Sequence, residues 1–258
     1  MLSKVKAFKL KKNKSKIVCL TAYSKNIAQI IDKHTDLILV GDSLGSVLYN
    51  FKSTRSVTLD MMIKHSISAR QGITNSLMVV DMPFNTYNNP TQALKNCKKV
   101  MKLTKCDGVK LEGGLKIIKI IKLLIKHRIP VMGHLGILPQ FTKGKFKSKG
   151  KSIKEKKEII RDAKLLEDAG AFSIVLECVE KNLAKEITNS IRIPTIGIGS
   201  SHNCDGQVLV TDDILGLTNS KIKFVKKFVN TKKTISFGVK QFKKQVKSNK
   251  YPTKRYSY

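Results

Sequence analysis

Four apolar runs in this chain each end at an acidic residue, and this pattern constrains the fold more than any other feature. The four residues are Asp42, Asp81, Glu112 and Glu177. The runs are rich in β-branched and aliphatic residues, which is typical of strands buried on both faces of a parallel sheet. Enzymes built on α/β barrels or open α/β sheets carry their chemistry at the carboxyl ends of such strands. The pattern therefore indicates a metal-dependent enzyme.

Apolar runs alternate along the chain with amphipathic stretches of helical length. Strict alternation of this kind implies right-handed crossovers and a parallel sheet. The number of expected strands and the length of 258 residues favour a closed (β/α)8 barrel over a doubly wound sheet. The expected strands lie near 17–21, 37–41, 77–81, 108–112, 130–135, 172–177, 194–198 and 207–211, and the clearest helices at 58–71, 90–104, 115–127, 153–169 and 181–191.

The two ends of the chain are strongly basic and depart from this alternation. We predict one barrel domain over residues 1–258, with a basic N-terminal extension (1–16) and a basic C-terminal tail (about 230–258). Two helix-like pieces near the end, 224–229 and 237–246, are expected to pack across the bottom of the barrel or to form an oligomer contact. Separately, the Gly- and Lys-rich segment 141–152 is either a solvated loop or a mobile lid.

The net charge of +32 raises the alternative of a nucleic-acid-binding protein. However, the lysines are spread along the chain, and the sequence contains no helix-turn-helix, zinc-finger or RNA-recognition pattern. Aromatic residues make up 6% of the chain, which is poor for base stacking. We therefore expect no specific nucleic-acid partner.

The compartment is predicted from the cysteines and the apolar runs. The five cysteines are widely spaced and include no C-x-x-C pair, so neither a disulfide framework nor a zinc site is expected. No apolar run approaches the ~20 residues that a membrane span needs. The basic N-terminus is followed by an apolar stretch too short for a signal sequence. These features predict a cytoplasmic protein with no membrane partner.

Asp42 and Asp81 are the first candidates for chemistry. Two carboxylates at the ends of separate strands suit a hard divalent cation that keeps open positions for substrate, and Glu112 would complete or support that site. The alternative for each is a helix N-cap or an ion pair with one of the many basic residues. That alternative is reasonable for any one of the three and much weaker for all of them together.

Other polar residues lie at or near the same strand ends. Lys110 and Glu112 are two residues apart and so face the same side of one strand, as functional groups or as a structural ion pair. His134 ends another strand, where it is either functional or a hydrogen-bonded core residue. Glu177 follows four aliphatic residues, a setting that suits proton transfer, although a salt bridge is the alternative. Ser43, in a Gly-flanked turn, is placed to donate to a substrate carboxylate.

Several of these segments are individually distinctive, and together they resemble the ketopantoate hydroxymethyltransferase family. The likeness covers roughly residues 17–228. Lys149 and Ser200 depart from the family pattern, which has Gln and Ala at these positions. The matching segments are TAYS (21–24), VGDSLG (40–45), DMPF (81–84), KLEGG (110–114), GHLGILPQ (133–140), LECV (176–179), IPTIGIGS (193–200) and DGQVLV (205–210).

The resemblance implies a (β/α)8 barrel of the phosphoenolpyruvate/pyruvate type, assembled as a homodecamer. It implies Mg2+-dependent transfer of a hydroxymethyl group from 5,10-methylenetetrahydrofolate to 3-methyl-2-oxobutanoate, giving 2-dehydropantoate for pantothenate biosynthesis. Another Mg2+-enolate lyase or mutase of the same barrel superfamily is the alternative. The implied metal ligands are Asp42 and Asp81 with the associated Glu112, the implied substrate contacts are Asp42, Ser43, Asp81 and Lys110, and the implied catalytic base is Glu177. From its place at a strand end, we expect His134 to contact the substrate and help orient it.

Overall fold

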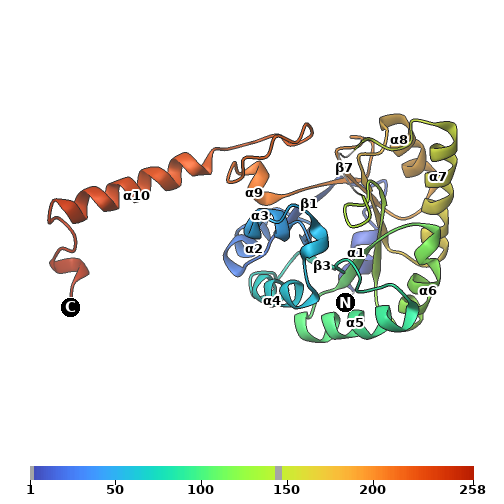
Figure 1. Cartoon of the computed structure of the whole chain (residues 1–258), viewed down its shortest axis with the longest axis horizontal. Coiled ribbons are helices and arrows are strands. Elements are labelled where there is room, and N and C mark those ends of the chain that lie inside the picture. The colour runs from blue at the N-terminus through green and yellow to red at the C-terminus, as the bar shows by residue number, and fades with distance from the viewer. Residues whose placement is uncertain (1–2, 143–146) are drawn as a thin grey trace. The chain divides into compact units, whose positions relative to one another are not determined.

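Eight parallel strands form a closed barrel in the computed structural model of this chain, which describes residues 3–142 and 147–258 (Figure 1). Each strand pairs with the next in sequence, and β8 pairs with β1 to close the barrel. This confirms the predicted (β/α)8 fold. The strands are β1 (Ile17–Thr21), β2 (Leu37–Val40), β3 (Leu77–Asp81), β4 (Gly108–Glu112), β5 (Val131–Gly136), β6 (Ser173–Glu177), β7 (Thr195–Ile198) and β8 (Gly206–Leu209).

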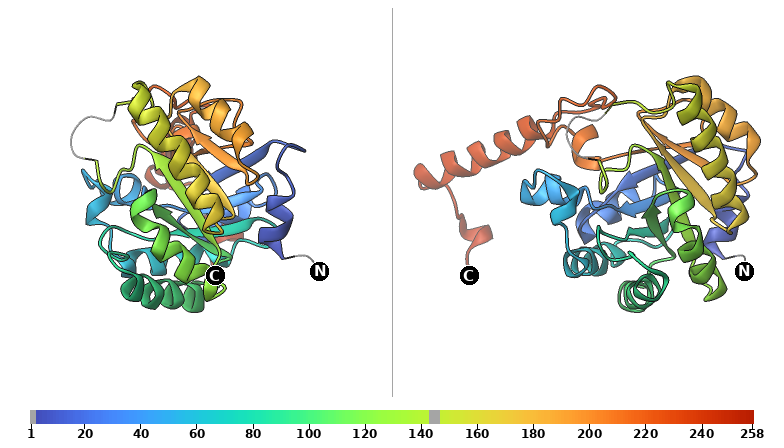
Figure 2. Two further views of the ribbon diagram at one scale, coloured as in Figure 1. Left: turned by 90° about the vertical axis from the view of Figure 1, so that its right-hand side faces the viewer. Right: turned by 45° about the vertical axis from the view of Figure 1, so that its right-hand side comes forward.

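Helices cover the outside of the strands (Figures 1 and 2). The predicted starts of α5 and α7 are correct because Asn89 and Ser152 cap them, each accepting a hydrogen bond from a backbone N–H three residues on. Two short helices, α2 and α3, were not expected. The helices of the barrel are α2 (Lys25–Ile31), α3 (Leu44–Tyr49), α4 (Leu59–Arg70), α5 (Pro90–Thr104), α6 (Ile118–Lys126), α7 (Ile153–Asp168) and α8 (Lys181–Ser190), with 3-10 turns η1 (Thr54–Ser56) and η2 (Leu115–Ile117).

The core has two parts because alternate residues of a strand face opposite sides of the sheet. On β2, Ile38 and Val40 pack with the helices, whereas Leu37 and Leu39 belong to a separate cluster inside the barrel. The interior is thus a packed core of side-chain layers and not a channel. The same alternation fixes which residues lie above this core at the carboxyl ends of the strands.

The basic N-terminal segment contributes to this core. It forms α1 (Lys4–Lys9), whose Phe8 is buried and packs edge-on against Phe172 with ring centroids 5.9 Å apart. A little further on, Lys12 Nζ lies 2.8 Å from Asp205 Oδ2 in a pair that is almost fully buried. The contacts of Phe8 and Lys12 therefore attach this segment to the barrel.

The chain divides into two compact units, residues 1–210 and residues 211–258. The second contains α9 (Thr211–Ile214), α10 (Thr231–Lys247) and the 3-10 turn η3 (Lys254–Tyr256). The predicted helical piece at 224–229 is wrong, since these residues form no helix, whereas the piece at 237–246 lies within α10. Across residues 3–142 and 147–258, no helix is long and apolar enough to span a membrane.

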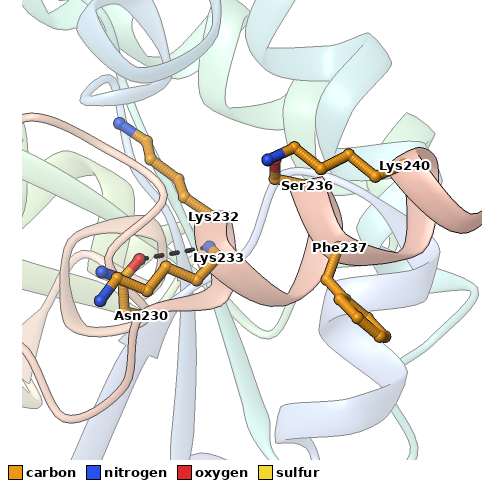
Figure 3. A pocket seen from close by; sticks show the side chains of 6 residues that line it. All are labelled: Asn230, Lys232, Lys233, Ser236, Phe237 and Lys240. Atoms are coloured by element: carbon orange, nitrogen blue, oxygen red, sulfur yellow. Dashed lines mark hydrogen bonds between the residues drawn. The ribbon is translucent and has the colours of Figure 1, made fainter.

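All side chains of α10 lie outside any core. The start of this helix borders a pocket in which the Asn230 side chain accepts a hydrogen bond from the Lys233 backbone N–H (Figure 3). The pocket contains three lysines and no carboxylate, so it offers no group for the predicted metal chemistry. Its lining residues are Asn230, Lys232, Lys233, Ser236, Phe237 and Lys240.

Asp32, just after α2, organises the turn that leads into β3. Its carboxylate accepts hydrogen bonds from the backbone N–H groups of Thr74, Asn75 and Ser76 at 2.8–3.2 Å, and from the side chains of Thr74 and Asn75. Burial alone would raise the pKa of Asp32, but these hydrogen bonds outweigh it and lower the pKa below its usual value. The turn therefore depends on an ionised carboxylate.

In the Asp32→Asn variant we expect the free energy of unfolding at pH 7 to fall by about 2 kcal/mol or more, because hydrogen bonds to a charged group are lost. The folded-state pKa of Asp32 is lowered, so its contribution is complete above the unfolded value of about 3.9 and is lost as the pH falls below that value. Urea unfolding at pH 7 and pH 3 would measure this, with Asp60→Asn on the surface as control. If the free energies of unfolding of wild type and Asp32→Asn differed by the same amount at pH 7 and pH 3, the expectation would be contradicted.

Candidate active site

The predicted site residues gather at the carboxyl ends of five neighbouring strands, β2 to β6. The strand register places Asp81 beside Lys110, Glu112 beside His134, and Gly136 beside Glu177. Asp42 follows β2 directly, and its backbone N–H donates to Asp81 Oδ2 at 3.0 Å. The structure therefore brings together six of the seven predicted residues in one connected group.

Three carboxylates, those of Asp42, Asp81 and Glu112, form the buried centre of this group. Burial and the negative charges of Asp81 and Glu112 raise the pKa of Asp42 to about 8. Burial also raises the pKa of Asp81, although the Lys110 ammonium opposes this change. The centre therefore has more negative charge than its surroundings can balance.

Lys110 and His134 supply the positive charge. Lys110 Nζ lies 3.2 Å from Asp81 Oδ1, and burial, which would lower the Lys110 pKa, is outweighed by Asp81 and Glu112, so that the pKa is raised. His134 lies between two carboxylates, with Nδ1 3.5 Å from Glu112 Oε1 and Nε2 3.3 Å from Glu177 Oε2.

The charge state of His134 follows from these contacts. Burial and the nearby Lys110 would lower the pKa of His134, but Glu112 and Glu177 outweigh them and raise it to about 9. Conversely, burial would raise the pKa of Glu112, but the contact with His134 and the charge of Lys110 lower it. His134 and Glu112 therefore form a charged pair at neutral pH.

The donor set fits a hard divalent cation. Asp81 Oδ1 and Glu112 Oε1 are buried and face cationic groups, Lys110 Nζ at 3.2 Å and His134 Nδ1 at 3.5 Å, and carboxylate oxygens are ligands that Mg2+ prefers. Within residues 3–142 and 147–258 no three His, Cys, Asp or Glu side chains are already arranged around a common ion position. The three predicted ligands therefore form no ready-made cage, and an ion held by one or two of these carboxylates would complete its coordination with water and substrate.

Ser43, the seventh predicted residue, lies half-buried at the start of α3. Its side chain makes no capping hydrogen bond, and its Oγ is 2.8 Å from the hydroxyl of Tyr23. The predicted interaction of Ser43 with a substrate carboxylate stays a prediction. The contact identifies Tyr23, two residues after β1, as a further polar neighbour of the site.

Two functional candidates, Gln140 and Tyr87, were missed as individual residues. Gln140 Nε2 donates to Asp42 Oδ2 at 2.8 Å, and the Tyr87 hydroxyl donates to Gln140 Oε1 at 2.6 Å. The signal for Gln140 was present, since it ends the distinctive segment GHLGILPQ. Nothing around Tyr87 in the sequence marks it.

Backbone geometry near Glu177 requires a glycine. Gly136, at the end of β5, has φ of 95°, and a Cβ there would lie 2.2 Å from the carbonyl oxygen of Glu177. This close approach allows the N–H of Ile137 to donate to the same carbonyl at 2.9 Å. The glycine thus permits β5 and β6 to stay paired up to the level of His134 and Glu177.

The predicted loop or lid at 141–152 is described in part, because residues 143–146 lie outside the described residues. Lys149 forms an isolated parallel β-bridge with Val179, and its backbone N–H donates to the carbonyl of Cys178 at 2.9 Å. The far end of the segment is therefore attached next to the strand that carries Glu177. Lid motion stays a prediction.

Fold and site together define a (β/α)8-barrel protein with a buried carboxylate cluster at the carboxyl ends of its strands. Solved barrels share the fold at low identity. Phosphonopyruvate hydrolase, in its complex with oxalate and Mg2+, is 9% identical with a TM-score of 0.62, covering 99% of this chain and 93% of that one. A 2,3-dimethylmalate lyase of the PEP mutase/isocitrate lyase superfamily is 11% identical with a TM-score of 0.62, covering 100% and 89%.

Sequence comparison identifies the family. The model of the ketopantoate hydroxymethyltransferase family matches residues 3–254, and this chain belongs to that family of enzymes. The 3-methyl-2-oxobutanoate hydroxymethyltransferase of Pelagibacter ubique (strain HTCC1062) is 64% identical over 258 residues, covering 100% of both chains. The protein of the same name from Anaplasma marginale (strain St. Maries) is 45% identical over 260 residues, covering 100% of this chain and 94% of the relative.

The position of His134 between two carboxylates leads to a pH prediction. In Glu177→Gln we expect the pKa of His134 to fall from about 9 by about one unit, because a negative charge that favours the imidazolium is removed. NMR titration of the imidazole nitrogens would measure this, with the exposed Glu158→Gln as matched control. An unchanged His134 pKa in Glu177→Gln would show that the contact at 3.3 Å does not persist in solution.

Proposed function

We propose that this enzyme transfers a hydroxymethyl group from 5,10-methylenetetrahydrofolate to 3-methyl-2-oxobutanoate, giving 2-dehydropantoate in pantothenate biosynthesis. The proposal includes dependence on Mg2+ and a place in the cytoplasm. The observation that carries it is the buried group formed by Asp42, Asp81 and Glu112 with Lys110, His134 and Glu177 beside it. The names of the full-length relatives support the choice of substrate.

The predicted metal ligands are Asp42, Asp81 and Glu112. When bound, Mg2+ would act as a Lewis acid that stabilises negative charge on the oxygens of a 2-oxo acid. The buried oxygens Asp81 Oδ1 and Glu112 Oε1 support this assignment, since a cation would add to the positive charge that Lys110 and His134 already place beside them. Burial and the negative charges of Asp81 and Glu112 raise the pKa of Asp42, and a cation at this position would offset both effects.

Glu177 is the proposed base for the C3 proton of the oxo acid. It is more accessible than the three central carboxylates, with 16% of its side chain exposed, so a substrate can reach it. His134 Nε2 lies 3.3 Å from Glu177 Oε2, and the charge of the imidazolium would attract the carboxylate toward the ring. Removal of the proton would leave an enolate, whose C3 would form a bond to the methylene carbon of the folate. In the overall reaction both carbon–nitrogen bonds of that methylene group break and water supplies the new hydroxyl group. The two folate nitrogens receive the proton taken from C3 and one proton of the water, which releases tetrahydrofolate.

Lys110 would stabilise the developing oxyanion. Its Nζ lies 3.2 Å from Asp81 Oδ1, and its raised pKa keeps it charged throughout the accessible pH range. Ser43 Oγ, oriented by the Tyr23 hydroxyl, would donate to the substrate carboxylate. In this proposal Lys110 balances the charge of the oxyanion, and Ser43 orients the substrate.

Proton NMR of 3-methyl-2-oxobutanoate in D2O tests the enolisation step. We expect the C3–H signal to disappear with the enzyme and Mg2+ and to persist when EDTA is present. A new hydroxymethyl resonance should appear once methylenetetrahydrofolate is added. Exchange without transfer would instead favour another Mg2+-enolate lyase or mutase of the superfamily. Cleavage of isocitrate- or oxaloacetate-like acids without folate would then be measured.

Glu177→Gln should abolish C3–H exchange, since an amide cannot accept the proton, while Mn2+ binding measured by EPR stays within about twofold of wild type. Glu158→Gln, an exposed change on α7, should exchange normally. Persistent exchange in Glu177→Gln would remove Glu177 from the role of base without affecting the metal proposal.

We also propose that the enzyme is a homo-oligomer, with the ten subunits that the family resemblance implies. The support is α10, on which large apolar side chains are exposed, and such patches often mark contacts between proteins. The exposed residues are Ile235, Phe237, Val239, Phe242 and Val246.

Sedimentation velocity should therefore give one discrete species larger than the 28.9 kDa monomer. The double change Phe237→Ser and Val239→Ser should shift the distribution to smaller species, because it removes apolar surface from α10. Ile153→Ser, at the exposed start of α7, is the control. A monomeric wild-type enzyme would contradict the proposed assembly.

A further inference from the structure

Gln140 occupies a central position in the buried site. It lies four residues after Gly136 in the segment that follows β5, and it is 1% exposed. Polar side chains buried to this degree are normally satisfied by hydrogen bonds, and each missing bond is costly. Gln140 satisfies this requirement entirely through groups of the candidate active site.

The side-chain amide of Gln140 has a defined orientation. Nε2 donates to Asp42 Oδ2 at 2.8 Å and to the Met82 carbonyl oxygen at 2.9 Å, and Oε1 accepts from the Tyr87 hydroxyl at 2.6 Å. A carbonyl oxygen can only accept, so the contact with Met82 identifies the NH2 end of the amide. Tyr87 therefore fixes one end of the amide while the other end holds Asp42.

The backbone of Gln140 holds a second carboxylate. Its N–H donates to Glu112 Oε2 at 3.0 Å. The Tyr87 hydroxyl, in turn, accepts from the backbone N–H of Glu112 at 3.4 Å. Thus one residue connects Asp42, which follows β2, with Glu112, at the end of β4.

We propose that Gln140 is a positioning residue that, together with Tyr87, sets the orientation of Asp42 and Glu112 toward the divalent cation. The inference rests on the proposed function, because it assumes a cation at these carboxylates. Gln140 holds Asp42 Oδ2 and Glu112 Oε2, which leaves the second oxygen of each carboxylate to face the ion. The second oxygen of Glu112, Oε1, is buried with His134 Nδ1 3.5 Å away, so the ion would share this oxygen with the imidazolium.

A neutral hydrogen-bond donor such as the Gln140 amide suits the orientation of metal-binding carboxylates better than a cationic side chain does. Lysine or arginine at this position would neutralise the carboxylates and compete with the metal ion for them. The amide and peptide N–H groups of Gln140 restrict the orientation of both carboxylates and add no net charge. Groups that orient metal ligands in this way commonly change metal affinity by 10–100-fold.

The test is an EPR titration of the full-length enzyme with Mn2+, using Gln140→Met, which keeps the size of the side chain and its backbone N–H. We expect the Mn2+ dissociation constant to rise about tenfold, because Asp42 loses its donor. Tyr87→Phe, which leaves Gln140 in place but frees its amide, should raise the constant about threefold. In the double variant the two effects should not add, since both act through the same amide.

The control is Thr188→Val, which removes another buried hydroxyl with hydrogen bonds to the Ala184 carbonyl and to Thr195, away from the carboxylates. It should lower the melting temperature and leave Mn2+ affinity unchanged, which separates loss of stability from loss of ligand orientation. If Gln140→Met does not fold, Tyr87→Phe decides the question.

Two outcomes overturn the inference in distinguishable ways. If wild type binds Mn2+ and the folded variants bind it within twofold of wild type, Gln140 and Tyr87 are structural and the proposed metal site still stands. If wild type itself binds no Mn2+, the proposed metal site fails and the inference fails with it.

Discussion

The two-residue period of the parallel strands determines both the core and the site. On β3, β5 and β6 the residues Val79, Met132 and Val175 fill the barrel interior, and the residues two positions later are Asp81, His134 and Glu177. Because residues two apart face the same side, each strand changes from apolar to ionisable along one face. A register shift of one residue would turn these charged groups into the helix-facing core, so the site and the packing specify the same register.

The site is acidic within a strongly basic chain. The net charge of +32 arises mostly from exposed lysines, whereas the buried centre contains three carboxylates with Lys110 and His134 as their cationic neighbours. The charges inside the buried site influence one another more strongly than the net charge of the chain does, since salt screens exposed charges over about 8–10 Å. Under the proposed function, the positive surface would attract the anionic oxo acid and the anionic folate, a role for the charge that does not involve nucleic acid.

The strand ends were predictable from sequence because apolar runs, period and acidic residues all lie within a few neighbouring positions. All eight strands and the gathering of Asp81, Lys110, Glu112, His134 and Glu177 followed from that local pattern. Tyr87 was not predictable, since its role depends on a hydroxyl that meets Gln140 from a different loop. Phe8 was hidden in a basic segment, and residues 224–229 have a helical pattern without forming a helix.

His134 separates the two kinds of carboxylate in this site. One ring nitrogen faces Glu112 Oε1 and the other faces Glu177 Oε2, so the imidazolium lies between a predicted metal ligand and the proposed base. Without this positive charge, Glu177 would lie close to a cation site as one more anionic ligand and would be drawn toward the ion. With it, Glu177 is held at the accessible edge. In the proposed mechanism the histidine would therefore allow closely placed carboxylates to do different chemistry, by the same use of environment that sets paired carboxyl groups apart in other enzymes.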